Sequence, residues 1–471
     1  MRREFTARPY QTIGARWIAE HERCALWAGM GMGKTITSLN VLDALYNLAG
    51  ETGPTLILAP LRVARDTWPA EAGKWDHLHG LDVVPITGSA AERRDALRRP
   101  GLVYSINYEN LPWLVETLGE RWPYRNVIAD ESTKLKSFRA GGYKKDGTAK
   151  RSAHGSVRAQ ALARFAHTRV RRWVNLTGTP ASNGLADLWG QTWFLDAGER
   201  LGRTYGAFQE RFFRPVRNAE GYFDWLPAEH TQPLIQRQLA DICLTLDPAD
   251  WFDVEAPIIN RVNVTLPAAA RAKYREMERE MFTQIEGADI EAVSAAAKTT
   301  KCLMMASGTA YTGEGKQWVP LHDEKLAALE SVVNEANGMP VLVAYQWVPD
   351  RERILAAFPK AADLATKEGM ARFRAGRAPI GVAHPQSLGH GIDGLQDVTN
   401  IIAFYSAWWS LEHHDQIIER IGPVRQMQSG HRRPVFIHYI TAERTLDELV
   451  LERYAGKREV QDLLLDYMRR C

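Results

Sequence analysis

A glycine-rich loop that ends in Lys-Thr is the feature that most constrains this chain. The loop runs Trp27-Ala-Gly-Met-Gly-Met-Gly-Lys-Thr35, and an apolar helical pattern begins directly after it. A loop with so few Cβ atoms can turn its backbone N–H groups toward phosphate oxygens, and the following helix points its positive end at the same anion. The pattern predicts a strand–loop–helix unit that binds a nucleotide; a chance glycine-rich turn is the alternative.

The residue types of this loop suggest separate roles. Its glycines form the expected phosphate cradle: Gly29, Gly31 and Gly33. Ala28 stands where the usual spacing has its first glycine, but the remaining glycines suffice for the tight turn. Lys34 can reach the β- and γ-phosphates, and the hydroxyl of Thr35 can ligate Mg²⁺. We therefore expect ATP and Mg²⁺ as cofactors.

Short apolar runs alternate with helical or polar segments through two parts of the chain. In the first part they lie at 54–60, 81–86, 101–106, 126–131 and 173–180. In the second part they lie at 339–345, 378–384, 399–405 and 434–440. Continuous apolar runs of this length are typical of strands buried on both faces of a parallel sheet. The predicted fold class is α/β, with two parallel sheets separated by a region of helical pattern.

Two acids, Asp130 and Glu131, end the fourth of these runs. Proteins with parallel sheets place ligands at the carboxyl ends of strands. In phosphoryl transfer one acid at such an end holds Mg²⁺, a role that fits Asp130, and a second can activate water, a role that fits Glu131. An ordinary solvated turn is the alternative.

Other polar residues near these strands give weaker indications of a functional role. Gln11, upstream of the loop, carries a paired donor and acceptor that can read an adenine edge, although a surface glutamine is the alternative. Thr177 and Thr179 follow the strand at 173–180 and can relay the state of the γ-phosphate to a neighbouring element. Ser105, in the strand at 101–106, is assigned to the same coupling or DNA-binding group.

Taken together, these segments resemble the Swi/Snf-type ATPases of helicase superfamily 2, in a minimal phage or bacterial form. The matching segments are Arg8-Pro-Tyr-Gln11, Gly31-Met-Gly-Lys-Thr35, Leu58-Ala-Pro60 with Trp68 after it, Asp130-Glu131, and Leu176-Thr-Gly-Thr-Pro-Ala-Ser-Asn183 with Asp187-Leu-Trp189 after it. The last string is the most specific. Ser132-Thr133 stands where the family usually has Ala-His.

The resemblance implies two RecA-like parallel-sheet lobes with a helical insertion between them. The expected divisions are an ATP-binding lobe over 1–195, a helical insertion or linker over 196–336, and a second RecA-like lobe over 337–471. It also implies that Arg8 and Gln11 bind nucleotide.

In the second lobe the resemblance assigns further residues. Gly389 and Asp393 lie in a segment that the family places between nucleic acid and ATP, and Asp393 can accept a bond from the ribose. Gln416 and Arg420 fit the family's Gln-then-Arg spacing, but Pro423 stands at the second arginine. Arg425 is then the expected arginine finger with Arg420 supporting it, or the two roles are reversed.

The composition excludes some classes of protein and leaves others open. The net charge of +3 is too small to argue for nucleic acid by itself, and no apolar run is long enough to span a bilayer. The four cysteines are far apart, which argues against a disulfide framework or a zinc site. Residues 134–158 are strongly basic and read as a surface loop that either contacts DNA phosphates or is simply solvated.

Three functions are consistent with these residues. The first, implied by the resemblance, is a DNA-dependent ATPase that translocates on duplex DNA and remodels DNA or DNA–protein complexes, as in repair or recombination. The second is a strand-separating or branch-migrating helicase. The third is a nucleotide-gated DNA-binding module without motor activity. We expect a monomer in the cytoplasm of a bacterial or phage-infected cell, with a nuclear setting left open and protein partners unknown.

Overall fold

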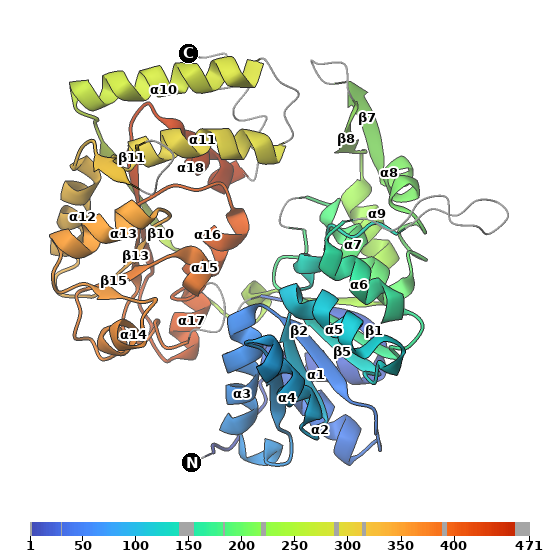
Figure 1. The fold of residues 1–471 in the computed structure, drawn as a ribbon. Coiled ribbons are helices and arrows are strands. Elements are labelled where there is room, and N and C mark those ends of the chain that lie inside the picture. Colours follow the sequence, from blue (N-terminus) through green and yellow to red (C-terminus); the bar gives the residue numbers. More distant parts are fainter. Residues whose placement is uncertain are drawn as a thin grey trace. The chain divides into compact units, whose positions relative to one another are not determined.

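The computed structural model describes residues 2–29, 31–140, 155–181, 184–217, 223–286, 292–312, 317–388 and 393–456. The chain forms two compact units, Met1–Trp251 and Phe252–Cys471 (Figure 1). None of the described helices combines the length and the apolar character needed to cross a membrane.

The first unit is built on a seven-stranded sheet in which every pairing is parallel. Its strands, in spatial order, are β3 (Val83–Ile86), β4 (Val103–Asn107), β2 (Thr55–Ala59), β5 (Asn126–Asp130), β6 (Arg172–Thr177), β1 (Arg23–Ala28) and β9 (Cys243–Leu246). All residues of β2, β4 and β5 are buried, as expected for strands with helices on both faces.

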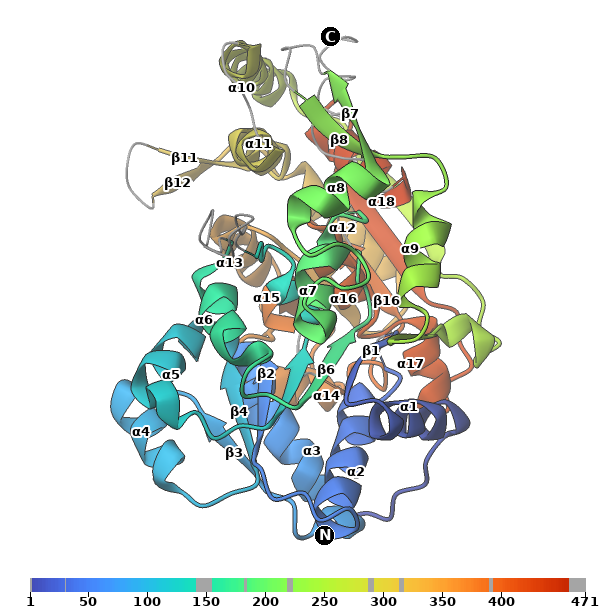
Figure 2. The same cartoon turned by 90° about the vertical axis from the view of Figure 1, so that its right-hand side faces the viewer.

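Helices cover both faces of this sheet (Figure 2). They are α1 (Pro9–Glu20), α2 (Lys34–Asn47), α3 (Trp68–Lys74), α4 (Ala90–Arg98), α5 (Leu111–Leu118), α6 (Val157–Ala166), α7 (Asp187–Asp196), α8 (Tyr205–Phe212) and α9 (Thr231–Leu239). Alternate strand residues such as Leu56, Leu58 and Val127 pack with α5, α6 and α7 in one buried apolar cluster. On the other face α1 lies close enough to β1 that a Cβ on Gly14 would contact Leu26.

The second unit contains a six-stranded sheet, again with only parallel pairings. Its strands, in spatial order, are β10 (Ile258–Val264), β17 (Phe436–Ala442), β16 (Ile401–Phe404), β13 (Val341–Ala344), β15 (Ile380–Ala383) and β14 (Ala362–Asp363). Its helices are α10 (Ala268–Glu286), α11 (Ala292–Ala306), α12 (Glu324–Glu335), α13 (Val348–Ala357), α14 (Lys367–Arg374), α15 (Pro385–Leu388), α16 (Leu411–Ile418), α17 (Pro423–Gln428) and α18 (Leu446–Gly456). The prediction of two parallel-sheet lobes is confirmed.

The region between the lobes differs from the expected helical insertion over 196–336. It also contains strands: a hairpin of β7 (Phe213–Arg217) and β8 (Phe223–Pro227), a second hairpin of β11 (Thr309–Tyr311) and β12 (Trp318–Pro320), and the edge strands β9 and β10. β9 pairs with β1 of the first sheet and β10 pairs with β17 of the second. An edge strand makes its backbone hydrogen bonds with the sheet that it joins. The region is therefore divided between the two units at residue 251 and does not form a third unit.

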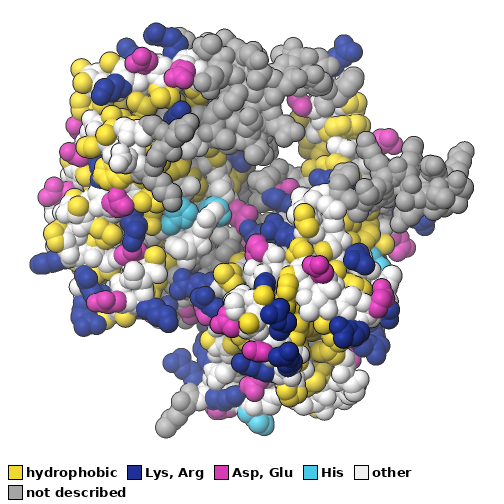
Figure 3. Space-filling view, in the orientation of Figure 1, with side chains coloured by type: hydrophobic (Ala, Val, Ile, Leu, Met, Phe, Trp, Pro, Cys, Tyr) yellow, Lys and Arg dark blue, Asp and Glu magenta, His cyan; other side chains and the backbone are white. Residues whose placement is uncertain are grey.

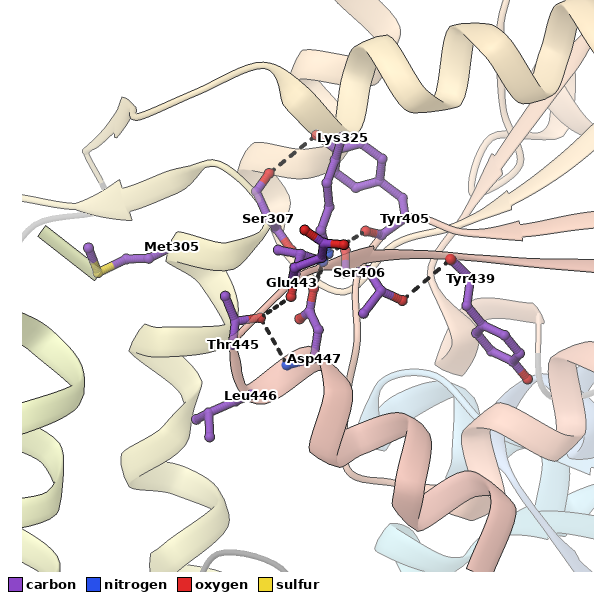
Figure 4. A network of polar contacts seen from close by, with 12 residues as sticks. Met305, Ser307, Lys325, Tyr405, Ser406, Tyr439, Glu443, Thr445, Leu446 and Asp447 are labelled. Atoms are coloured by element: carbon purple, nitrogen blue, oxygen red, sulfur yellow. Dashed lines mark hydrogen bonds and ion pairs between the residues drawn. The ribbon is translucent and has the colours of Figure 1, made fainter. Parts of the chain in front are cut away.

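A buried ion pair joins three elements of the second unit (Figure 4). Lys325, in α12, donates through Nζ to Oδ2 of Asp447 at 2.6 Å and to the carbonyl of Tyr405 at 3.2 Å, and both charged side chains are almost completely buried. Asp447, in α18, also accepts from the backbone N–H of Ala442 at the end of β17. The pair therefore ties α12 and α18 to the carboxyl edge of the sheet.

Replacing Lys325 with methionine is expected to lower the free energy of unfolding by about 3–5 kcal/mol, because Asp447 would keep a buried and uncompensated charge. Adding Asp447→Asn should recover part of the loss, since no unpaired charge then remains. Denaturant unfolding of both variants measures the effect. Lys360→Met, at an exposed lysine of the same unit, is the control and should change little. Equal stability of Lys325→Met and the control would contradict the proposed importance of the pair.

Candidate functional site

The glycine-rich loop connects β1 to α2 at the carboxyl end of the first sheet, as predicted. Gly31 and Gly33 have positive φ values of 82° and 73°, and Gly33 caps the N-terminus of α2 in the left-handed conformation. A Cβ on Gly33 would lie 2.3 Å from Nε2 of Gln11. A Cβ on Gly29 would lie 2.3 Å from Cγ of Pro248. Gly31 and Gly33 are thus favoured by their positive φ values, and Gly29 by its close approach to the ring of Pro248.

Gly33→Ala is expected to destabilise the first unit by more than the roughly 1–2 kcal/mol of a left-handed alanine, because the end of the Gln11 side chain must move away and this disturbs the hydrogen bond that it accepts from the N–H of Arg8. Gly50→Ala is the matched control: Gly50 has φ 67°, and a Cβ there would meet nothing within 4 Å in the described part of the chain. Thermal unfolding compares the two variants. Equal stability of Gly33→Ala and Gly50→Ala would show that the Gln11 side chain moves aside without cost.

Lys34 begins α2 and turns back toward the loop. Its Nζ donates to the carbonyls of Ala28 at 2.7 Å and Gly29 at 3.2 Å. Its charge also reaches Asp130, the last residue of β5. Burial raises the pKa of the Asp130 carboxyl, while the charge of Lys34 and a 2.9 Å hydrogen bond from Trp68 Nε1 to Oδ2 oppose that rise. The structure therefore brings Lys34 and Asp130 together, and a further cation beside them would favour the carboxylate form.

Glu131, the second acid, has an unusual backbone conformation. Its φ and ψ are 60° and 57°, in the left-handed region, which costs a non-glycine residue about 1–3 kcal/mol. The hydroxyl of Tyr108 donates to the carbonyls of Asp130 at 2.9 Å and Glu131 at 3.3 Å and so helps to hold this turn. The turn makes Glu131 half-buried at the carboxyl edge of the sheet, next to Asp130. Strain of this kind is common at catalytic positions.

Ser132, which stands in place of the family's usual alanine, connects the acids to a second loop. Its hydroxyl lies 2.8 Å from Oε1 of Gln191 in α7. Nε2 of Gln191 donates to the carbonyl of Pro180 at 2.6 Å, and the backbone N–H of Thr179 donates to Oγ1 of Thr177 at 3.2 Å. Ser132 and Gln191 are fully buried. Gln191 thus links the loop after β5 to the Thr-Gly-Thr-Pro loop after β6.

Gln191 and Tyr108 were not among the predicted site residues. Neither belongs to a motif: Tyr108 follows β4, and Gln191 lies in α7, two residues after the matching segment Asp187-Leu-Trp189. The signal for Gln191 was a polar residue within an otherwise apolar helical stretch that follows Asp187-Leu-Trp189, but only the packing of α7 shows where it points.

Three other predicted residues of the first unit, Gln11, Thr35 and Ser105, differ in burial and in hydrogen-bond partners. Oε1 of Gln11 accepts from the backbone N–H of Arg8 at 2.9 Å, so its acceptor is already engaged at the start of α1. Thr35 is the second residue of α2 and half-buried. Ser105 is fully buried in β4, and its hydroxyl donates to the carbonyl of Ala64 at 2.6 Å. A side chain with that environment supports packing and is not placed to touch DNA.

In the second unit, two predicted residues contact each other. Nη1 of Arg425, in α17, donates to Oδ1 of Asp393 at 3.0 Å, and Nε2 of Gln396 donates to the same oxygen at 3.0 Å. In this structure Arg425, the expected arginine finger, is therefore bonded to Asp393, the residue expected to bind ribose. Arg425 has a side chain that is 18% exposed, while Arg420 is 6% exposed as a residue.

The remaining predictions in this unit concern Gln416 and Gly389. Gln416 is buried in α16, where its Nε2 donates to Oε1 of Glu412 at 3.2 Å. Gly389 lies outside the described residues, as does most of the basic loop. Among the residues that the structure describes, no group of three or more His, Cys, Asp or Glu is arranged to hold a metal ion. A site made by Thr35 and Asp130 would rely on phosphate oxygens and water for its other ligands, as Mg²⁺ commonly does.

Comparison with known proteins gives the family. A model of the SNF2-related domain matches residues 10–306. The chain belongs to the SNF2-related family. Its two parallel-sheet lobes are accordingly the RecA-like lobes of a Swi/Snf-type, helicase-like ATPase core of superfamily 2.

Individual relatives fall into two groups. The putative protein p41 of Acyrthosiphon pisum secondary endosymbiont phage 1 is 52% identical over 471 residues, with 99% of both chains covered. Helicase swr1 of Emericella nidulans is 32% identical over 227 residues, which are 45% of this chain and 12% of that protein. Helicase SWR1 of Saccharomyces cerevisiae is 30% identical over 226 residues, 13% of its length. This chain thus spans only a small part of the eukaryotic helicases that it matches.

Among solved structures, the Pyrococcus furiosus Hef helicase domain has the same fold. The two chains superpose with a TM-score of 0.52 and 15% sequence identity, over 96% of this chain and 98% of that one. At this identity the likeness concerns the fold alone.

Proposed function

We propose that this protein is a DNA-stimulated ATPase that translocates on duplex DNA. The observation that carries the proposal is the convergence of Lys34, Asp130 and Glu131 at the carboxyl edge of one parallel sheet, beside a loop in which Gly31 and Gly33 have positive φ values. This arrangement fits ATP, because the loop N–H groups and the N-terminus of α2 suit phosphate oxygens. It also fits Mg²⁺, because Thr35 and Asp130 offer a hydroxyl and a carboxylate.

The residues have distinct tasks in this proposal. The glycine loop and Lys34 hold the β- and γ-phosphates, and Lys34 leaves the carbonyls of Ala28 and Gly29 to do so. Mg²⁺, when bound, neutralises charge on the phosphates. Glu131 accepts a proton from the attacking water and orients it. Gln191 transmits a change at the acids to the loop that contains Thr177 and Thr179, since one side chain bonds to both segments.

Arg425 supplies the remaining positive charge. As an arginine finger it would leave Asp393 and approach the transferred phosphoryl group, with Arg420 in support or in the reverse role. An arginine contributed by a second lobe makes hydrolysis depend on lobe closure, and closure linked to turnover can be converted into steps along a strand.

DNA as the substrate is supported by membership of the family and by the similarity to the helicases of Emericella nidulans and Saccharomyces cerevisiae. The relative from a phage supports a setting in a bacterial or phage-infected cell. Two alternatives remain as competing proposals: a strand-separating or branch-migrating helicase, and a nucleotide-gated module without motor activity. The set of residues needed for turnover favours an enzyme over the module.

Two assays, of ATP hydrolysis and of strand displacement, test these proposals. ATP hydrolysis is measured with no nucleic acid and with single-stranded, duplex and branched DNA and RNA. We expect duplex DNA to stimulate the rate most. Hydrolysis with no response to any nucleic acid would contradict the DNA-dependent motor, and strand displacement on forked or four-way DNA would favour the helicase alternative.

A further inference from the structure

The carboxylate that accepts from Arg425 is held in place by a cluster of polar contacts in the second unit. Oδ1 of Asp393 accepts from Nη1 of Arg425 and from Nε2 of Gln396, both at 3.0 Å. Nε2 of Gln396 also donates to Oγ of Ser429 at 3.1 Å, and its Oε1 accepts from the backbone N–H of Gly394 at 3.0 Å. Gln396 is buried, so a fixed side chain decides where the Asp393 carboxylate lies.

A second arginine holds the backbone of the same residue. Nη2 of Arg374, in α14, donates to the carbonyl of Asp393. Lys and Arg side chains gather along the lower edge of the second unit in the space-filling view, where α14 and α17 lie (Figure 3). Surroundings of this charge attract a carboxylate. The contacts therefore keep Asp393 beside α17, the helix that contains Arg425.

The position that Arg425 adopts does not satisfy its whole side chain. Its Nε is buried and has no hydrogen-bond partner within the part of the chain that the structure describes. A buried donor without an acceptor is unfavourable. The side chains of the pair are 18% exposed for Arg425 and 65% exposed for Asp393, and an ion pair of this kind contributes little free energy. Arg425 can therefore leave Asp393 without a large loss.

The contact also reduces what the arginine can do. While Arg425 lies against Asp393, the negative charge of the carboxylate offsets the positive charge of the guanidinium toward any third group. An arginine in this state stabilises charge on a transferred phosphoryl group poorly. The hydrolysis rate is then limited by the fraction of molecules in which Arg425 is released.

We propose that Asp393 is a latch that holds Arg425 away from ATP until DNA is bound. The latch consists of the Asp393–Arg425 ion pair and of Gln396, which positions it. This inference rests on the proposed function, in which Arg425 is the arginine finger, and it adds the contact that keeps hydrolysis slow without DNA. With duplex DNA bound, closure of the lobes gives Arg425 a phosphate partner in place of the carboxylate.

The test measures kcat for ATP hydrolysis without DNA and with saturating duplex DNA. Asp393→Asn removes the charge and is expected to raise the rate without DNA by about two- to five-fold, the effect of a partly exposed ion pair, with the DNA-stimulated rate nearly unchanged. Gln396→Leu keeps the carboxylate but loses its positioning, so it should cause a smaller rise. Asp397→Asn, at an acid that pairs with His431 at 3.4 Å, is the control and should match the unmodified protein.

Ionic strength provides a second measurement on the same proteins. Salt screens an exposed ion pair, so the rates of the unmodified protein and of Asp393→Asn without DNA should converge as salt is raised. The melting temperature of Asp393→Asn should stay within a few degrees of that of the unmodified protein, because a weak pair contributes little to stability.

A rate without DNA that is unchanged in folded Asp393→Asn would overturn the latch. A higher KM for ATP with no rise in kcat would also overturn it, in favour of the predicted ribose contact. Neither result bears on whether duplex DNA stimulates the unmodified protein. The proposed function fails instead if duplex DNA does not stimulate that protein, or if Arg425→Ala and Arg420→Ala both hydrolyse ATP normally.

Discussion

Glu131→Gln is expected to lower kcat for ATP hydrolysis by about 10²–10⁴, the usual contribution of a general base. Glutamine has nearly the same shape but cannot accept the proton of the attacking water. Asp130, Lys34 and the glycine loop are unchanged, so the affinity for Mg·ATP should be retained. Steady-state hydrolysis together with calorimetric binding of Mg·ATP separates the two effects.

The control for this variant is Glu116→Gln, which makes the same change at an exposed glutamate of α5 in the same unit. It should hydrolyse ATP like the unmodified protein. Normal turnover by Glu131→Gln would show that the base is another residue. A loss of nucleotide affinity as large as the loss of rate would instead indicate that Glu131 supports the loop rather than the chemistry.

Arg425→Ala is expected to reduce kcat by about 10³–10⁵, the range for loss of an arginine finger, while nucleotide binding to the first unit persists. The effect is large because the lost charge stabilises the transferred phosphoryl group mainly in the transition state. Its ion pair with Asp393 is partly exposed and makes a small contribution to stability, so the variant should fold normally. Hydrolysis and binding assays on the same preparation measure both properties.

Arg420→Ala distinguishes the two candidate fingers. Arg420 is almost fully buried, so its removal should lower the melting temperature, whereas removal of Arg425 should not. Arg377→Ala, at an exposed arginine of the second unit, is the control for loss of one positive charge. If Arg425→Ala hydrolysed ATP normally and Arg420→Ala, still folded, did not, the two roles would be reversed.

Sequence reasoning worked best where a motif is contiguous. The loop from Gly29 to Thr35 contains, within seven consecutive residues, all the groups predicted to bind phosphate. Acids that end one parallel strand must lie at the same edge of the sheet as a loop that follows another strand. The proximity of Lys34 and Asp130 was therefore predictable without coordinates. The sequence did not show that Ser105 is buried and bonded to the carbonyl of Ala64, because a serine in a strand carries no sign of which way it faces.

Domain division was harder to predict, because strands at sheet edges have weak patterns. β10 has a largely exposed or half-buried sequence, Ile-Ile-Asn-Arg-Val-Asn-Val, and its membership of the second sheet depends on pairing with β17 far along the chain. Such pairings are set by long-range hydrogen bonds, which local composition does not record. The same holds for the link from Ser132 through Gln191 to Pro180.

The sequence by itself determined the fold class and the family, because these follow from local periodicity and from short motifs. The phosphate-binding role of the glycine-rich loop and the roles of the acid pair stay predictions. Only the tertiary structure decided that Glu131 turns through a left-handed conformation, that Asp393 holds Arg425, and that the hairpin β7–β8 exposes Trp225. Backbone strain, ion-pair partners and exposure depend on neighbours distant in the chain, and those neighbours are brought together only by folding.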